Sequence, residues 1–135
     1  MTAEQAKIVE IVERTGDINL IAEIKSIIES SGKTKVFLLN CQIAGTSYVE
    51  NIKYLEDELY ELDELLLERE PKNEFDKMAV VIKDKNKNKL GYIPKSKNEV
   101  VARLMDAGLK IYGVLKYKEW KDQYLILALG IYMER

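Results

Sequence analysis

The chain of 135 residues contains no histidine and only one cysteine, Cys41. Catalysis by Ser-His-Asp or Cys-His groups is excluded, because both need an imidazole base. A structural zinc site needs about four Cys or His ligands, so a zinc finger is excluded too. Cys41 lies in the apolar segment 38–43, which has a strand pattern. This placement indicates a buried thiol without a chemical role.

Proline and long hydrophobic runs are also scarce. The chain has 2 prolines, and no apolar run approaches the roughly 20 residues that a membrane span requires. The first residues lack the basic and apolar regions of a signal peptide. Hydrophobic residues at 47% and charged residues at 33% are typical of one folded domain with its own core. We therefore expect a cytoplasmic protein that does not contact a membrane.

Charge of one sign is unevenly distributed along the chain. Residues 56–70 carry eight carboxylates and one cation, Arg69, whereas residues 83–97 carry six lysines and one carboxylate, Asp84. The net charge of −2 therefore hides a basic segment. Such a segment either attracts polyanions or keeps a lysine-rich hairpin in solution.

The N-terminal part has a helical pattern. Apolar spacings of three and four residues predict two helices within 3–31, so residues 1–32 form a helical extension. The pair has no basic face. We expect it to pack on the main domain or to form a homodimer with a second copy.

From residue 35 the pattern changes to that of strands. We expect a β-hairpin over 78–93 with its turn at 85–88, and a second hairpin with its tip at 120–122. A capping box of Ser96 and Glu99 is expected to open a helix that ends at Gly108. The expected strands are 36–44, 62–69, 78–83, 89–93, 109–119 and 123–133, with a short helix within 49–60. The fold class is α+β: a small closed or nearly closed antiparallel β-barrel with an internal helix.

The loop that follows strand 62–69 is the best candidate for a site. It presents Asn73, Phe75 and Asp76 close together, and Tyr92 follows Gly91 near the end of the next hairpin. Aromatic rings, an amide and a carboxylate on neighbouring loops indicate a binding site and not a catalytic one.

Four segments carry a resemblance to the HIRAN domain family. They are IAGTSY at 43–48, LLEREPKNEFDKMAV at 66–80, LGYIP at 90–94 and ARLMDAG at 102–108. The resemblance covers roughly residues 33–133, leaves out the N-terminal helices, and implies an OB-like β-barrel with helices. We expect residues 33–135 to form this domain. Members occur in front of helicase-like DNA-repair remodellers and as stand-alone bacterial proteins. The best-understood members bind single-stranded DNA at a free 3′ end.

The resemblance also implies roles for individual residues. Asp76 is expected to accept a hydrogen bond from the terminal 3′-hydroxyl, and Phe75 to stack on a base in place of the usual tyrosine. Lysines near the loop are expected to contact phosphates. The implied nucleic-acid-binding residues are Tyr48, Lys72, Asn73, Phe75, Asp76, Lys77, Tyr92 and Tyr124.

This sequence departs from the family pattern at three positions. Ser47 stands where a DNA-binding member carries arginine, Glu74 replaces a common proline, and Met78 replaces a common asparagine. The first two make the surroundings of the loop less cationic. Lys72, Lys77 and the lysines of 83–97 compensate only if they face the same groove.

Three interpretations of the function stay open. The first is a non-catalytic module, without a cofactor or a metal, that binds single-stranded DNA 3′ ends in DNA repair beside a helicase or ATPase partner. The second is a protein-interaction or regulatory domain on the same barrel, with weak or no DNA binding. The third is a metal-dependent hydrolase using Glu68, Glu70 and Asp76.

Three residues also have a structural alternative. Asp76 could cap its own loop by accepting backbone N–H groups. Arg69 is expected to be a structural ion-pair partner among its neighbouring acids. Trp120, at the expected hairpin tip, is either a binding platform or a packing lid.

Overall fold

The computed structural model describes residues 6, 10–11, 13–14 and 35–134. The helical pair expected within 3–31, and with it the expected homodimer contact, falls largely outside the described residues. The described positions of this part are helical: Ala6, Glu10, Ile11, Glu13 and Arg14.

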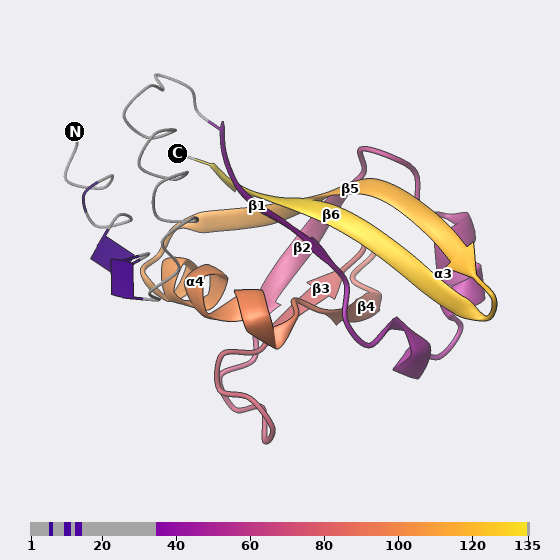
Figure 1. Cartoon of the computed structure of the whole chain (residues 1–135), viewed down its shortest axis with the longest axis horizontal. Coiled ribbons are helices and arrows are strands. Elements are labelled where there is room, and N and C mark those ends of the chain that lie inside the picture. Colours follow the sequence, from indigo (N-terminus) through magenta and orange to yellow (C-terminus); the bar gives the residue numbers. More distant parts are fainter. Residues whose placement is uncertain (1–5, 7–9, 12, 15–34, 135) are drawn as a thin grey trace.

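Six antiparallel strands form one sheet in the order β1-β6-β5-β2-β3-β4. The sheet curls into a half-barrel, with the helix α4 lying along one side (Figure 1). The strands are β1 (Lys35–Gln42), β2 (Glu64–Arg69), β3 (Val80–Lys83), β4 (Lys89–Tyr92), β5 (Lys110–Lys121) and β6 (Tyr124–Glu134). Each expected strand between residues 36 and 133 is therefore confirmed, with small shifts at the ends.

A single bridge links the two edge strands of this curled sheet. The backbone N–H of Ala44, just after β1, donates to the carbonyl of Tyr92 in β4 at 2.8 Å, and the reverse bond has the same length. A Cβ atom at Gly91 would lie 2.4 Å from the carbonyl oxygen of Ala44 and 2.5 Å from Cγ2 of Ile43. Only glycine fits this crossing, so Gly91 allows the sheet edges to meet.

Three helical segments complete the domain: η1 (Thr46–Tyr48), α3 (Ile52–Asp57) and α4 (Lys95–Asp106). The short helix expected within 49–60 is confirmed as α3. The capping box at the start of α4 is wrong: Pro94 is the N-cap, no side chain caps the helix, and Glu99 pairs with Arg103 at 2.9 Å. The backbone begins the helix without a side-chain cap: the N–H of Lys97 donates to the carbonyl of Pro94 at 2.9 Å.

The C-terminus of α4 follows the expectation. Gly108 has φ +90°, and its N–H donates to the carbonyl of Met105 at 2.9 Å. A left-handed residue at this position is the common end of a helix, and glycine adopts it without steric cost.

The core fills the concave face of the sheet beneath α4. Its largest fully buried side chains are leucines and isoleucines from every strand and from α4. Cys41 is buried in β1, and burial raises the pKa of its thiol to about 11. The expected buried thiol is confirmed, and at neutral pH it is protonated and unreactive.

The β5–β6 hairpin is longer than the sequence indicated. Trp120 is paired with Leu125 inside the hairpin, and the turn lies at Asp122 and Gln123. The expected position of Trp120 at the tip is therefore wrong. Its ring is 36% exposed and lines a pocket with residues of α3, so the choice between a binding platform and a packing lid stays a prediction. Among the residues described, no helix is long and apolar enough to cross a membrane.

Candidate functional site

The loop between β2 and β3 folds around the side chain of Asn73. Its Oδ1 accepts from the backbone N–H of Phe75 at 2.9 Å and of Asp76 at 3.1 Å. An Asx turn of this kind fixes a loop without regular secondary structure. The Phe75 ring is consequently held outside the fold, where it is 85% exposed.

Asp76 is fixed from two directions. Its Oδ1 accepts from the N–H of Met78 at 2.9 Å, and its Oδ2 accepts from Nδ2 of Asn98 in α4 at 2.7 Å. These two hydrogen bonds, with the charges of Lys95 and Arg69, lower the pKa of the Asp76 carboxyl below its ordinary value. The loop-capping alternative is thus observed. A carboxylate has about four lone-pair sites, so two remain for a ligand hydroxyl.

Glu70 connects this loop to Tyr92. Its Oε1 accepts from Nδ2 of Asn73 at 3.0 Å and from the hydroxyl of Tyr92 at 2.8 Å. Burial alone would raise the pKa of Glu70, but these hydrogen bonds and the charges of Lys89 and Lys83 outweigh it and lower the pKa. The loop and strand β4 therefore form one hydrogen-bonded unit.

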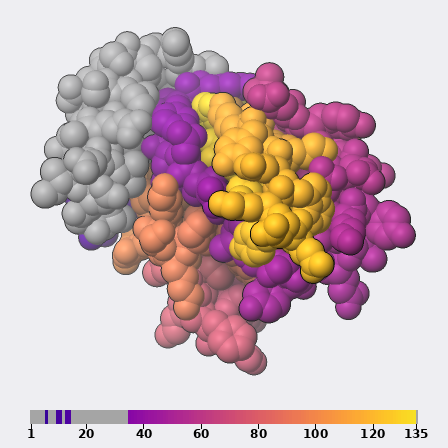
Figure 2. Space-filling model, turned by 45° about the vertical axis from the view of Figure 1, so that its right-hand side comes forward, coloured from indigo at the N-terminus to yellow at the C-terminus, as the bar shows by residue number. Residues whose placement is uncertain are grey.

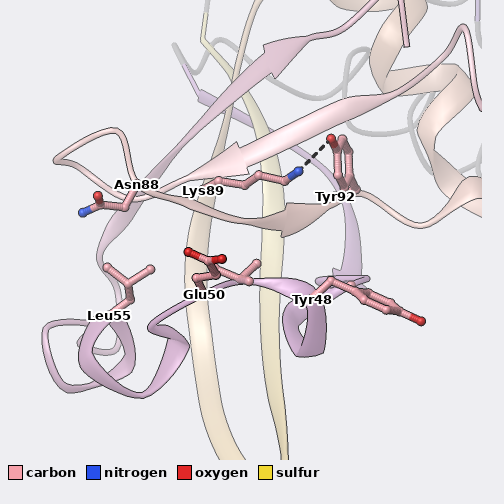
Figure 3. A pocket seen from close by; sticks show the side chains of 8 residues that line it. Tyr48, Glu50, Leu55, Asn88, Lys89 and Tyr92 are labelled. Carbon is pink, nitrogen blue, oxygen red and sulfur yellow. Dashed lines mark hydrogen bonds between the residues drawn. The ribbon is translucent and has the colours of Figure 1, made fainter. Parts of the chain in front are cut away.

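A pocket of about 340 Å³ lies beside Tyr92. It is lined by Tyr48 from η1 and by Lys89, whose Nζ donates to the Tyr92 hydroxyl at 3.0 Å and lies 4.4 Å from the ring centroid (Figure 3). The Tyr48 side chain extends outward past the pocket and is 90% exposed. Glu50 points into the same space. The structure thus brings Tyr48 and Tyr92 to one pocket.

Arg69 holds the base of the loop. It donates to both carboxylate oxygens of Asp106 in α4, at 2.9 and 3.2 Å, and to the carbonyls of Ala79 at 2.7 Å and Lys77 at 3.0 Å. All of these contacts are internal to the fold. The structural role expected for Arg69 is confirmed, but its acid partner is Asp106 and not a neighbour in the 56–70 stretch.

The lysines of 83–97 divide between two sides of the domain. Lys89 lines the Tyr48–Tyr92 pocket, and the charge of Lys95 acts on Asp76. Lys83 pairs with Glu68 at 2.7 Å, whereas Lys97 reaches the carbonyl of Asn40 on the far side of α4. Part of the basic segment therefore faces the candidate site.

The remaining candidates lie at the periphery. Lys72 and Lys77 are exposed on the loop. Tyr124 is half exposed at the start of β6 and does not line the Tyr48–Tyr92 pocket. It lies next to Leu125, whose carbonyl accepts from Oγ1 of the buried Thr46 at 2.8 Å, so η1 and the start of β6 are held together.

The sequence did not indicate Asn98, and it indicated Glu70 only as a possible metal ligand. Glu70 joins Asn73 to Tyr92, and Asn98 is 4% exposed and donates to Asp76. Polar side chains that form hydrogen bonds with residues distant in the sequence leave no short-range sequence pattern. The one sequence signal that could have indicated Asn98 is its position on the face of α4 that packs against the core.

The three carboxylates of the hydrolase hypothesis point to different partners. Glu68 pairs with Lys83, Glu70 with Tyr92 and Asn73, and Asp76 with Asn98. Within the described part of the chain, no group of three or more Cys, Asp or Glu is arranged to hold a metal ion.

Acid is expected to remove the stability that Asp76 contributes. Its folded-state pKa is lowered from 3.8, so the contribution is present above that pH and is lost as the pH falls through the lowered folded value. Urea unfolding of the wild type and of Asp76→Ala should differ most at neutral pH, and the difference should shrink at a pH below 3.8. An equal difference at both pH values would show that the charge of Asp76 has no part in stability.

Together, the curled antiparallel sheet and α4 define an OB-like domain, with an ordered loop and an adjoining two-tyrosine pocket as its candidate site. The family model of the HIRAN domain matches residues 36–132. The chain therefore belongs to the HIRAN domain family.

Solved structures of similar fold agree with this assignment. A protein from Lactobacillus plantarum is 30% identical, with a TM-score of 0.69, covering 75% of this chain and 97% of that one. The crystal structure of the human HLTF HIRAN domain is 20% identical, with a TM-score of 0.57, covering 78% of this chain and 84% of that one. The HLTF HIRAN domain in its DNA-bound conformation is 21% identical, with a TM-score of 0.53, covering 75% and 80%. No curated protein matches the chain.

Proposed function

We propose that this protein is a non-catalytic module that binds single-stranded DNA at its 3′ end. One observation carries the proposal: Asp76 is held as an ionised acceptor next to the exposed Phe75 ring, on a loop that Glu70 links to Tyr92. The HLTF HIRAN domain, which shares the fold, has a DNA-bound conformation. A role in DNA repair follows from the family resemblance.

The chemistry of each group suits a terminal nucleotide. Phe75 and Tyr48 offer flat apolar faces for stacking, worth about 1–3 kcal/mol per base. The Asp76 carboxylate accepts from a 3′-hydroxyl, and its negative charge repels a 3′-phosphate. Lys89 and Lys95, with Lys72 and Lys77 on the loop, supply the phosphate contacts that Ser47 cannot make.

Binding of a short single strand tests the proposal. The DNA is a fluorescently labelled strand of about 6 nucleotides with a free 3′-hydroxyl. We expect its anisotropy to rise when the protein is added at low salt, and the affinity to fall as the salt concentration increases. A DNA hairpin whose 3′ end is blocked should bind more weakly than this single strand. Absence of binding at low salt would remove the proposal.

Asp76→Asn is expected to reduce end discrimination. The amide keeps an oxygen for the N–H of Met78 and removes the negative charge. Affinity for a strand with a 3′-phosphate should therefore rise toward that for the 3′-hydroxyl strand. Glu74→Gln, which removes a neighbouring charge from the same loop, is the control. An equal change in both variants would mean that general charge, and not Asp76, sets the preference.

A second candidate function rests on the surface around α3. Leu62, within the acidic stretch 56–70, is 70% exposed and has φ +72°, and Tyr54, just before this stretch in α3, is 75% exposed. An exposed apolar pair among carboxylates suits a basic protein partner. Co-purification of such a partner, together with absence of DNA binding, would favour this function.

A further inference from the structure

A groove of about 750 Å³ crosses the outer face of β1, β6 and β5. Ala128 of β6 lies among its lining residues. Gly130 lies beneath the Lys116 side chain, because a Cβ atom there would be 2.9 Å from Cε of Lys116. Asn40 and Gln42 of β1 form one wall. We call this feature the β6 groove.

A β-bulge aims Lys116 across the groove. The register of β5 on β6 shifts between Leu115 and Tyr117, so Lys116 is the extra residue of the bulge. Bulges redirect side chains in this way. The Lys116 Nζ donates to the Tyr132 hydroxyl at 2.7 Å and lies 5.0 Å from the ring centroid, and the neighbouring Tyr117 ring is 46% exposed.

The positive charge of the β6 groove is not neutralised. Lys97 donates to the Asn40 carbonyl at 2.6 Å and Lys116 to the Tyr132 hydroxyl, and both acceptors are neutral. No carboxylate is among the residues that line the groove, and neither lysine has an ion-pair partner in the described part of the chain. By contrast, Lys110 on the same strand pairs with Glu134 at 2.9 Å.

The β6 groove is separate from the Asp76 loop. The two lie on either side of the first turn of α4, where Asn98 donates to Asp76 and the preceding Lys97 reaches Asn40. In Figure 2 the orange helix α4 lies between the purple β1 and the salmon loop. A strand that leaves the loop could therefore cross α4 and enter the groove.

We infer that the β6 groove is a second nucleic-acid contact, which holds the backbone of a single strand several nucleotides away from its 3′ end. Two uncompensated ammonium groups bind phosphates, the Tyr117 ring offers a stacking face, and the amides of Asn40 and Gln42 bond to sugar or base edges. The inference takes its ligand class from the proposed function, but the site and its residues are independent of the loop.

Strand length separates the two contacts. The double variant Lys97→Gln/Lys116→Gln should bind a strand of about 12 nucleotides roughly tenfold more weakly than the wild type, because two phosphate contacts are lost. The slope of log affinity against log salt should fall by about 1.4, at about 0.7 per phosphate of a single strand. Binding of a strand of about 3 nucleotides should be unchanged.

Lys110→Gln is the control for loss of a lysine outside the groove, whose positive charge Glu134 already neutralises. It should leave both affinities unchanged. An unchanged affinity of the double variant for the long strand would overturn the inference, as would equal competition by a polyglutamate peptide. If the long strand binds through Lys97 and Lys116 while the short strand does not bind at all, the groove stands and the end-binding proposal fails.

Discussion

Phe75→Ala is expected to weaken binding of a short single strand by roughly 5- to 150-fold. This range corresponds to the loss of one stacking contact worth about 1–3 kcal/mol. The ring is 85% exposed and is presented by the Asn73 turn, so its removal should change the free energy of unfolding by less than about 0.5 kcal/mol. Fluorescence anisotropy and urea unfolding of the same preparation measure the two effects separately.

The control for Phe75 is Tyr54→Ala. Tyr54 is also an exposed ring, at 75%, but it belongs to α3 and does not line the Tyr48–Tyr92 pocket. Its removal should leave the affinity unchanged. Wild-type affinity in Phe75→Ala, or an equal loss in both variants, would show that the loop does not present a stacking ring to the ligand.

Gly91→Ala is expected to destabilise the domain by about 3 kcal/mol, or roughly 10 °C in Tm. The added methyl group would lie 2.4 Å from the carbonyl oxygen of Ala44, which is fixed by its bridge to Tyr92. Relief of this contact must separate β4 from the end of β1. Because Tyr48 and Tyr92 face the same pocket across this bridge, binding of a short strand should also weaken.

Gly108→Ala separates steric overlap from backbone strain. Gly108 has φ +90°, but nothing lies within 4 Å of a Cβ built there. Only the left-handed backbone is then penalised, at about 1–2 kcal/mol. Thermal unfolding of both variants gives the comparison. A loss in Gly91→Ala no larger than that in Gly108→Ala would mean that the sheet edges do not meet closely.

The strands and helices were largely predictable because their signals are local. Short apolar segments bounded by turn residues marked the strands, and Gly108 marked the end of α4. The error at the start of α4 had a physical cause: Ser96 and Glu99 fit a capping box, but Pro94 begins the helix two residues earlier. The turn of the last hairpin was misplaced because Trp120 and Lys121 resemble loop residues and are paired in the ladder.

The candidate site was predictable only in part. Asn73, Phe75 and Asp76 are adjacent in sequence, so one motif indicated all three. Glu70 and Asn98 act through contacts with side chains 22 residues away, Tyr92 and Asp76 respectively, which no local pattern records. The binding roles of the loop residues stay predictions, whereas the arrangement of the loop is observed.

One measurement tests the central claim most directly: the affinity of the wild-type protein for two single strands that differ only at the 3′ end. The ionised Asp76 carboxylate accepts from a hydroxyl and repels a phosphate, so the strand with a 3′-hydroxyl should bind at least roughly tenfold more tightly. Equal affinities for the 3′-hydroxyl and 3′-phosphate strands would contradict recognition of the DNA end by this loop.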